Sequence, residues 1–226
     1  MNVSEAINAR QSVRAFTGQS VDLATVREIL ELAGRAPSGG NLQPWQVHVV
    51  AGDAKEALVQ AVYATAASQP TGETADIQMY PPGLQDPWRQ RRADCGERMY
   101  SVLGIARDDK AARFTQGAKN LSFFGAPVGL FVTTDRSMVE SQMMDVGMFI
   151  MSILLLAQER GLATCPQASW QMWAQTIRAS LDLDADEMIM AGISLGYADN
   201  GDPGADIRQP RTPLDDYATF NGFEED

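Results

Sequence analysis

Apolar positions along the chain recur at two spacings, one typical of helices and the other of strands. Between residues 22 and 33 they recur at intervals of three and four, which predicts an amphipathic helix that ends at Gly34 and Pro37. The longest helical pattern covers 140–160. Its middle, 146–157, is apolar on nearly every side, so we expect this helix to be central. The same spacing predicts shorter helices in three further segments: 3–9, 53–67 and 170–180.

Three short apolar runs have the composition of strands: 45–50, 127–134 and 188–197. Ser4 stands where the N-cap of the first helix belongs, and Asp53 and Glu56 have the spacing of a capping box. Helices alternate with strands along 226 residues, without repeats or a clear linker. This order predicts a single domain of the α+β or α/β class.

Two segments depart from this order. Residues 68–117 are rich in Pro, Gly and Arg and are too long for a structureless connector in a compact domain. We interpret them as an insertion with short helices that serves as a lid. The C-terminal extension, 203–226, carries Tyr217, Phe220 and Phe223, which so short a segment cannot bury by itself. It therefore either packs on a partner chain or is a frayed terminus.

Composition and charge exclude several classes of function. A formal net charge of −11 and a pI of about 4.5 argue against general binding to nucleic acids or anionic membranes. One histidine, His48, and two distant cysteines, Cys95 and Cys165, predict neither a metal site nor a disulfide framework. The run 146–157 is too short to span a membrane, and MNVSEAINARQSVR lacks the apolar core of a signal peptide. We therefore expect a cytoplasmic protein.

Two arginines and a hydroxyl lie close together near the N-terminus, in the order Arg10, Gln11, Ser12, Val13, Arg14. In an extended segment Arg10, Ser12 and Arg14 point to one face, and in a helix the two arginines still share a face. Two guanidinium groups and a hydroxyl can bind a phosphate through bidentate hydrogen bonds. The alternative is a solvated surface on which the two arginines are unrelated.

The segment 36–45, APSGGNLQPW, lies between a predicted helix and a predicted strand. Its two glycines permit a close approach of the backbone to a ligand. Ser38, Asn41 and Gln43 supply donors and acceptors that suit the edge of a planar heterocycle. The alternative is a helix C-cap followed by a turn, which leaves the Asn, Gln and Trp unexplained.

A third segment, GLATCPQASW at 161–170, follows the central helix and is interpreted as a loop whose backbone N–H groups could tune a flavin. Cys165 within it lacks an accompanying base motif, so a nucleophilic role is not favoured. His48, inside a predicted strand, is interpreted as structural. Arg208 and Arg211 stand in an acidic tail, where they either balance charge or add to a phosphate site.

The sequence contains no GxGxxG, Walker A, GxSxG or HExxH motif. Cavity-forming loops and basic groups are present, whereas a set of catalytic side chains is not. This combination suggests that a bound cofactor carries the chemistry, and no catalytic side chain is predicted.

Six segments, taken in order, resemble the FMN-dependent nitroreductase family. They cover most of the chain: ARQSVRAF at 9–16, ILELAGRAPSGGNLQPWQVHVV at 29–50, FFGAPVGLFV at 123–132, DVGMFIMSILLLAQERGLATCPQ at 145–167, AGISLGY at 191–197 and RTPLDDY at 211–217. The insertion is similar to that of the nitrobenzoate-reductase-like subgroup, through YPPGLQDPWRQRR at 80–92 and MYSVLGIARDD at 99–109.

The resemblance implies an α+β three-layer sandwich with a mixed central sheet flanked by helices. It also implies an intertwined homodimer with FMN at each of two interface sites. The residues implied to bind the FMN phosphate and ribityl chain are Arg10, Gln11, Ser12, Arg14, Arg208 and Arg211. Those implied to lie along the isoalloxazine are Pro37, Ser38, Gly39, Asn41 and Gln142. Pro166 and Gln167 would place a backbone N–H near the flavin N5.

The implied reaction is a ping-pong oxidoreduction. NADH or NADPH would give hydride to the flavin N5 and leave, and a nitroaromatic or quinone would then take two electrons in the same cavity. The residues expected to shape that cavity are Trp88, Tyr100, Phe123 and Phe124. The residues that could attract an acidic substituent or an NADPH phosphate are Arg89, Arg91 and Arg92, of which at least two are interpreted as solvated.

One departure from the family pattern affects the choice of reductant. Many members carry a lysine a few residues after the Asn of the flavin loop, but here LQPWQVHVV follows Asn41. Positive charge near the nicotinamide must therefore come from elsewhere, and the preference between NADH and NADPH stays open.

Two groups of alternatives remain. The same scaffold could reduce enones, dehalogenate halophenols or cleave a flavin with oxygen. Outside this class, the chain could be an FMN-binding protein without significant turnover, or an α+β interaction module without a cofactor.

Overall fold

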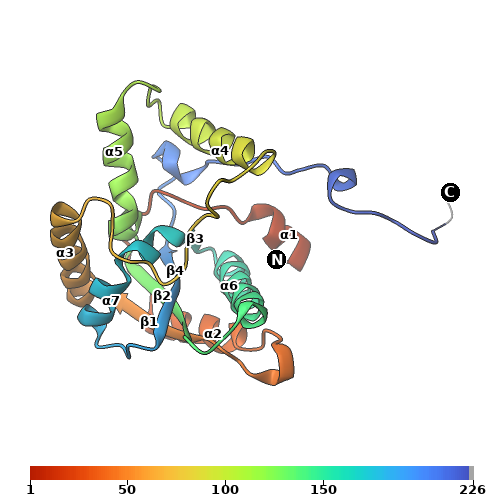
Figure 1. The fold of residues 1–226 in the computed structure, drawn as a ribbon, viewed down its shortest axis with the longest axis horizontal. Helices are drawn as coiled ribbons and strands as arrows, with labels where there is room; N and C mark the ends of the chain where they lie inside the picture. Colours follow the sequence, from red (N-terminus) through yellow and green to blue (C-terminus); the bar gives the residue numbers. More distant parts are fainter. Residues whose placement is uncertain (224–226) are drawn as a thin grey trace.

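The computed structural model describes residues 1–223, and residues 224–226, at the end of the predicted extension, lie outside the described part. The chain forms three layers, with a sheet between two pairs of helices (Figure 1). The pairs are α3 (Gly52–Ser68) with α7 (Ala174–Leu181) on one face, and α2 (Leu23–Ala33) with α6 (Glu140–Glu159) on the other. The predicted α+β sandwich is confirmed.

The sheet has four strands in the order β1-β2-β4-β3. The strands are β1 (Gln46–Ala51), β2 (Val128–Asp135), β3 (Ala163–Gln167) and β4 (Glu187–Gly196). All three neighbouring pairs are antiparallel, so the expected mixed sheet is wrong for the described chain. The one parallel pairing among residues 1–223 is the isolated bridge between Ser12 and Thr164. Strand β3 also corrects the interpretation of 161–170 as a loop.

The remaining helices are α1 (Val3–Ala9), α4 (Trp88–Val102) and α5 (Lys110–Ala118). The capping predictions were wrong at both sites. Asn2, rather than Ser4, caps α1, because its side chain accepts from the Glu5 N–H at 2.9 Å while the Glu5 carboxylate accepts from the Asn2 N–H. Helix α3 begins after Ala51 without a side-chain cap. The predicted helix at 170–180 is divided into a 3₁₀ helix, Ala168–Trp173, and α7.

An apolar core lies on each face of the sheet. Under α3 and α7, Trp170 is fully buried and its ring centroid lies 4.4 Å from that of Phe123. Under α2 and α6, Trp45 stacks on Phe149 at 4.7 Å. Gly192 makes room for Trp170, because a Cβ at this position would lie 2.1 Å from the indole Cδ1.

Helix α6 is buried on one side only, which corrects the expectation of a fully central helix. Val146, Phe149 and Ile153 face the core, whereas Met144 and Met148 are 67% and 40% exposed. Length and a mean hydropathy of 1.4 would by themselves suit a membrane span. However, α6 packs against α2 and the sheet, as a core helix does. Its other apolar face is left uncovered in a single chain.

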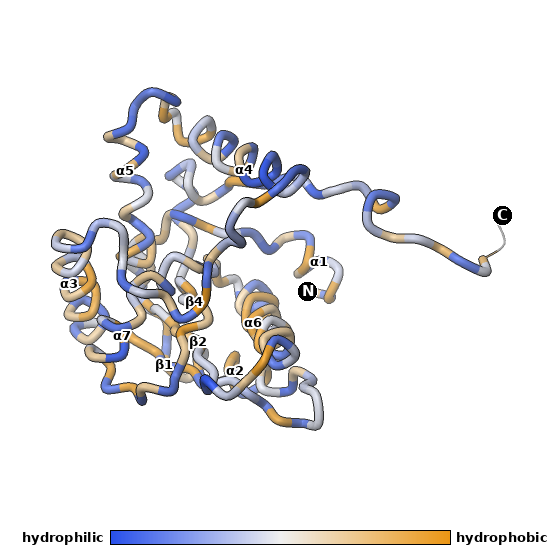
Figure 2. Tube along the Cα trace, viewed as in Figure 1, coloured by the Kyte–Doolittle hydropathy of each residue, from blue (hydrophilic) through white to orange (hydrophobic). Residues whose placement is uncertain are grey.

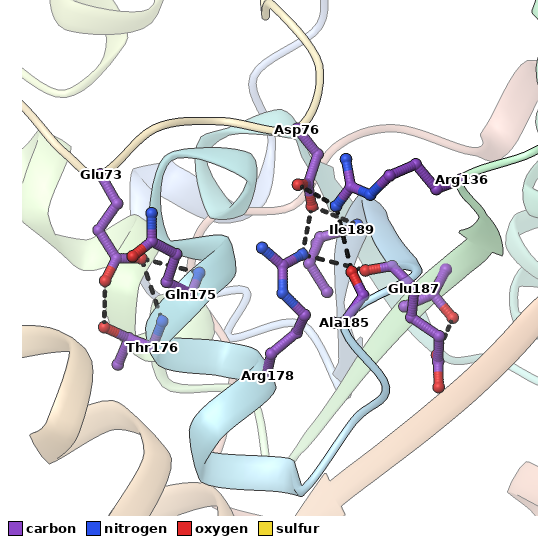
Figure 3. Close-up of polar contacts among 10 residues, drawn as sticks. Glu73, Asp76, Arg136, Gln175, Thr176, Arg178, Ala185, Glu187 and Ile189 are labelled. Carbon is purple, nitrogen blue, oxygen red and sulfur yellow. Dashed lines mark hydrogen bonds and ion pairs between the residues drawn. The ribbon is translucent and has the colours of Figure 1, made fainter.

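The insertion is anchored to the core at its beginning by two carboxylates (Figure 3). Glu73 accepts hydrogen bonds from the first turn of α7, including one of 2.7 Å from the Thr176 hydroxyl. Asp76 forms ion pairs with Arg136 at 2.8 Å and Arg178 at 2.5 Å. Helices α4 and α5 follow as predicted for an insertion with short helices, and they lie to one side of the sandwich (Figure 1). A lid function stays a prediction.

Candidate functional site

The segment with Arg10, Ser12 and Arg14 runs along the open edge of the sheet. The Val13 N–H donates to the Thr164 carbonyl of β3 at 2.9 Å, and the Arg14 N–H donates to the Gly204 carbonyl at 2.8 Å. These bonds hold the segment extended between the edge strand and the start of the tail. Of the two conformations considered, the segment takes the extended one, and the alternate residues Arg10, Ser12 and Arg14 lie on the segment beside β3.

Arg211 from the tail joins this segment, and we call Arg10, Ser12, Arg14 and Arg211 the cradle. Burial and, next, the positive charge of Arg211 lower the pKa of Arg10, so Arg211 lies within electrostatic range of Arg10. Within residues 1–223, no carboxylate lies within 4.0 Å of Arg10, Arg14 or Arg211, and the latter two donate only to nearby backbone carbonyls. Partly buried cations without an anionic partner suit a phosphate, so the cradle fits the FMN phosphate.

Arg208 and Gln11 are partly committed to structural contacts. Arg208 lies 3.4 Å from Asp206 and donates to the Asn8 carbonyl at 2.9 Å, which ties the tail to α1. The Gln11 amide donates to the Ala205 carbonyl at 2.9 Å, and its buried Oε1 has no partner in the described chain. Of the two tail arginines, Arg211 is thus the one with no competing carboxylate.

The end of β3 is held from behind by a buried network centred on Gln167. Its amide oxygen accepts from the Ser194 hydroxyl at 2.7 Å and from the Trp170 indole at 3.2 Å, and its amide nitrogen donates to the Asn120 carbonyl at 2.8 Å. Backbone N–H and C=O groups point to opposite sides of a strand at successive residues, and the Thr164 carbonyl points to the open edge of the sheet. The backbone groups of Gln167 therefore point towards β4, and the N–H of Ala168 points towards the open edge. The outward donor expected from Gln167 is therefore better assigned to Ala168.

Cys165 and His48, for which the sequence did not favour a functional role, lie in the core and in the sheet. Burial raises the pKa of Cys165 to about 11, so its thiol stays protonated at neutral pH and is a poor nucleophile. His48 Nε2 lies 2.6 Å from Glu187 Oε2, which also accepts from the Thr133 hydroxyl at 2.7 Å. This pair belongs to the sheet and not to the cradle.

The segment 36–45 forms a preorganised, exposed loop. Gly39–Asn41 is a 3₁₀ turn in which Gly40 and Asn41 have φ angles of 58° and 57°. The Gln43 N–H donates to the Ser38 hydroxyl at 2.9 Å, and the Gly39 N–H donates to the Asp145 carboxylate at 3.2 Å. A non-glycine residue in this left-handed conformation is strained, and such strain is often kept at binding sites. Pro37 precedes the turn and is exposed as well.

The loop and the cradle of one chain do not converge. The loop is bonded to Asp145, and Gln142 lies in the same first turns of α6, where it accepts from the Val139 N–H at 3.4 Å. Gln11, beside the cradle, instead shares a small cavity with Gln158. Asp145 and Gln158 lie thirteen positions apart on α6, or about 20 Å. The predicted site residues therefore fall into two separate groups in one chain, which we call half-sites.

The predicted substrate residues divide into core and surface residues. Phe123 and Phe124 are buried in the apolar core, which corrects their assignment to a cavity wall. Trp88, at the start of α4, is 59% exposed. Tyr100 lies under the Arg113 guanidinium, with 4.1 Å between that group and the ring centroid.

The three lid arginines have different environments. Arg89 pairs with Asp86 at 2.7 Å, and Arg92 lies 3.9 Å above the Tyr80 ring. Arg91 has no hydrogen-bonding side-chain partner within residues 1–223 and lines a groove beside the tail. It is thus the one of the three whose guanidinium is available to a ligand.

Some residues of the site were not found from the sequence. Ala168 and Ser194 lie in two segments considered from the sequence, 161–170 and 191–197, but neither residue was singled out, and neither Asn120 nor Asp145 was predicted. The pairing of β3 with β4 brings Ser194 to Gln167, and the 3₁₀ helix Lys119–Gly125 brings Asn120 to the same side chain.

An anion-binding cradle at a sheet edge, together with a separate loop rich in donors, defines an α+β protein that binds a phosphorylated cofactor. The chain belongs to the nitroreductase family, whose sequence model matches residues 7–197.

Two curated relatives and two solved structures support this assignment over nearly the whole chain. The 4-nitrobenzoate reductase of Nocardioides sp. (strain LMS-CY) is 39% identical, with 97% of this chain and 90% of that protein covered. The 4-nitrobenzoate reductase of Pseudomonas putida is 35% identical, with 96% and 95% covered. The FMN and NADPH-dependent nitroreductase NfnB of sphigopyxis sp. strain HMH superposes with a TM-score of 0.96 at 46% identity, covering 99% and 100%. The FMN-dependent NfnB of Mycobacterium smegmatis in complex with NADPH has a TM-score of 0.91 at 35% identity, covering 97% and 98%.

Proposed function

We propose that this protein is an FMN-dependent oxidoreductase that uses NADPH or NADH to reduce nitroaromatic or quinone-type acceptors. The observation that carries the proposal is the cradle: Arg10 and Arg14 lie on the segment beside β3, Arg211 lies within electrostatic range of Arg10, and none of the three has a carboxylate within 4.0 Å in the described chain. The similar proteins include 4-nitrobenzoate reductases and FMN- and NADPH-dependent enzymes. Bound FMN would supply two-electron transfer between the nicotinamide and the acceptor.

The chain's own residues would bind and orient the cofactor. The cradle would hold the phosphate, and the outward N–H of Ala168 at the end of β3 would face the ring. Within residues 1–223, the cradle includes no histidine or carboxylate, and the buried Cys165 stays protonated. This composition supports a mechanism that needs little acid–base catalysis from side chains.

The proposal includes a homodimer with FMN between the chains. The two half-sites lie at opposite ends of α6, so a second chain could place its loop, with Ser38 and Asn41, against this chain's cradle. Met144 and Met148 of α6 are exposed, and much of α6 has the colour of hydrophobic residues in Figure 2. An uncovered apolar face of this kind is typical of an obligate interface.

The tail supports the same arrangement. Leu214, Tyr217, Phe220 and Phe223 are all more than half exposed, and the tail extends away from the body of the chain (Figure 1). Packing of these side chains on the partner would bury them. A cytoplasmic location also stays part of the proposal, and the two unpaired cysteines are compatible with it.

The visible spectrum of the purified protein, before and after anaerobic addition of NADPH, tests the function. We expect flavin bands that bleach and then return when 4-nitrobenzoate or a quinone is added. Bands that do not bleach would indicate an FMN-binding protein without turnover. Turnover of enones or halophenols that is faster than that of nitroaromatics would overturn the substrate class.

A double variant, Arg10→Ala with Arg14→Ala, tests the cradle. This protein should purify without flavin and should fail to bind added FMN. The matched control is Arg107→Ala, because this arginine is 87% exposed on the insertion. An interaction module without a cofactor would give colourless wild-type protein as well.

A further inference from the structure

A groove of about 860 Å³ runs between α4 and the beginning of the tail. Figure 1 shows the tail passing alongside α4 before it leaves the body. A hydrogen bond of 3.2 Å from the Gln209 amide to the Cys95 carbonyl holds the two walls together. Three arginines line the groove: Arg91, Arg98 and Arg211.

The two arginines of α4 share one face of the helix and are free to bind a ligand. Arg91 and Arg98 are seven positions apart, which corresponds to two turns. Neither has a carboxylate within 4.0 Å in the part of the chain that the structure describes. On this wall Glu97 binds Arg113 through two bonds of 3.1 Å and Asp94 accepts an amide hydrogen bond at 2.7 Å, and one further carboxylate, Asp216, lines the groove from the tail.

The groove adjoins the cradle, because Arg211 belongs to both. A dinucleotide whose nicotinamide lies on the flavin must place its adenosine end well away from the ring. NADPH differs from NADH by the 2′-phosphate at that end, and the residues directly after Asn41, LQPWQVHVV, include no lysine to supply positive charge. We infer that Arg91 and Arg98 bind the 2′-phosphate of NADPH and give this enzyme its preference for NADPH. The inference rests on the proposed function.

The size and charge of the groove favour this ligand over the carboxylate of an aromatic acid. Arg91 and Arg98 offer two guanidinium groups without a carboxylate partner in the described chain, which suits a phosphate of about two negative charges better than a carboxylate of one. A volume of about 860 Å³ is also far larger than a single benzene ring requires. A phosphate with its ribose and adenine fits both features better.

The test compares both reductants in three variants of the flavin-loaded protein: Arg91→Ala, Arg98→Ala and the double variant. We expect kcat/KM with NADPH to fall about tenfold in the double variant, while kcat/KM with NADH changes less than about twofold. The wild-type preference should also shrink at high salt. Arg107→Ala, whose side chain does not line the groove, should keep the wild-type ratio.

A binding measurement separates this inference from the proposed function. Calorimetric titration with 2′,5′-ADP, and with 5′-AMP as the matched control without the 2′-phosphate, does not depend on turnover. We expect the wild type to bind 2′,5′-ADP more tightly, and the double variant to bind both alike. Equal binding in the wild type, equal losses with NADPH and NADH, or a loss confined to 4-nitrobenzoate would each overturn the inference. A colourless protein would instead overturn the proposed function.

Discussion

Replacement of Gln167 by leucine tests whether the buried network behind β3 holds the end of this strand in place. The Gln167 amide accepts from Ser194 and Trp170 and donates to the Asn120 carbonyl, over 2.7, 3.2 and 2.8 Å. Leucine fills a similar volume but removes these three hydrogen bonds and a fourth, of 3.3 Å, to the Asn120 side chain. The donors of Ser194 and Trp170 then stay buried without their acceptor, because both residues are fully buried.

The expected loss follows from these two stranded donors. A buried polar group without a partner costs about 1–3 kcal/mol, so two would cost about 2–6 kcal/mol. The Ser194 hydroxyl can rotate towards another acceptor, which favours the lower part of this range, about 2–4 kcal/mol. The assay is urea unfolding at fixed chain and FMN concentrations, since ligand and assembly both shift the midpoint. We expect a lower midpoint with an unchanged slope.

Ser194→Ala provides the matched control for this estimate. It removes one of the two donors that Gln167→Leu strands, so the double variant should be more stable than the sum of the single losses predicts. The coupling should be about 1 kcal/mol or more. Strictly additive losses, or a Gln167→Leu protein within about 0.5 kcal/mol of the wild type, would refute the role of the network.

Three further predictions concern acid stability, thiol reactivity and core packing. Burial raises the pKa of Asp76, but hydrogen bonds from its arginine partners outweigh this, so its folded pKa lies below the ordinary 3.8. The ion pairs of Asp76 therefore stabilise the fold fully above pH 3.8, and this stabilisation is lost as the pH falls through the folded pKa. In Asp76→Asn, the unfolding free energy should depend less on pH between about pH 5 and 3 than in the wild type. An unchanged pH dependence would contradict this. With Ellman's reagent at neutral pH, the exposed Cys95 should react in the native protein and the buried Cys165 only after denaturation. Gly192→Ala should lower stability by about 1–3 kcal/mol or more, because its Cβ would meet the buried indole, whereas Gly117→Ala, with open space around it, should stabilise α5 by up to about 1 kcal/mol in thermal unfolding.

The hydrophobic pattern predicted the elements whose burial is regular. The strand predicted at 188–197 is β4 (Glu187–Gly196), and the helix predicted at 140–160 is α6 (Glu140–Glu159). In both elements, residues that face the core recur at a regular spacing, and the apolar residues of the sequence have the same spacing. The pattern could not show that only one face of α6 is covered, because an apolar face looks the same whether the chain itself or a partner buries it.

Strand β3 was missed because its identity depends on distant partners. Its sequence, ATCPQ, contains a proline and has little strand character. As an edge strand it tolerates Pro166, and it is held by β4 on one side and by the Ser12 bridge on the other. Neither partner is adjacent in the sequence, so local pattern alone indicated a loop.

In the candidate site, too, local residue types could be predicted, whereas contacts between distant segments could not. The residue types of the cradle could be predicted, since two arginines and a serine within five positions already suit a phosphate. The approach of Arg211 to Arg10 depends on the tail returning to the N-terminal segment. Phe123 illustrates the opposite error. An aromatic residue beside a predicted substrate pocket is as easily a core residue, and here Gly129 makes room for its ring.

In the proposed homodimer, the position of the two half-sites along α6 would link cofactor binding to assembly. The loop is bonded near the beginning of this helix, at Asp145, and the segment that carries the cradle passes near its end, where Gln11 and Gln158 line one pocket. A two-fold axis that crosses α6 near its middle would place each loop against the partner's cradle, and both sites would be completed by the same contact. The exposed Met144 and Met148 lie on the stretch of helix that such a contact would cover. Burial of this face and binding of FMN would then favour each other, because each stabilises the same dimeric arrangement.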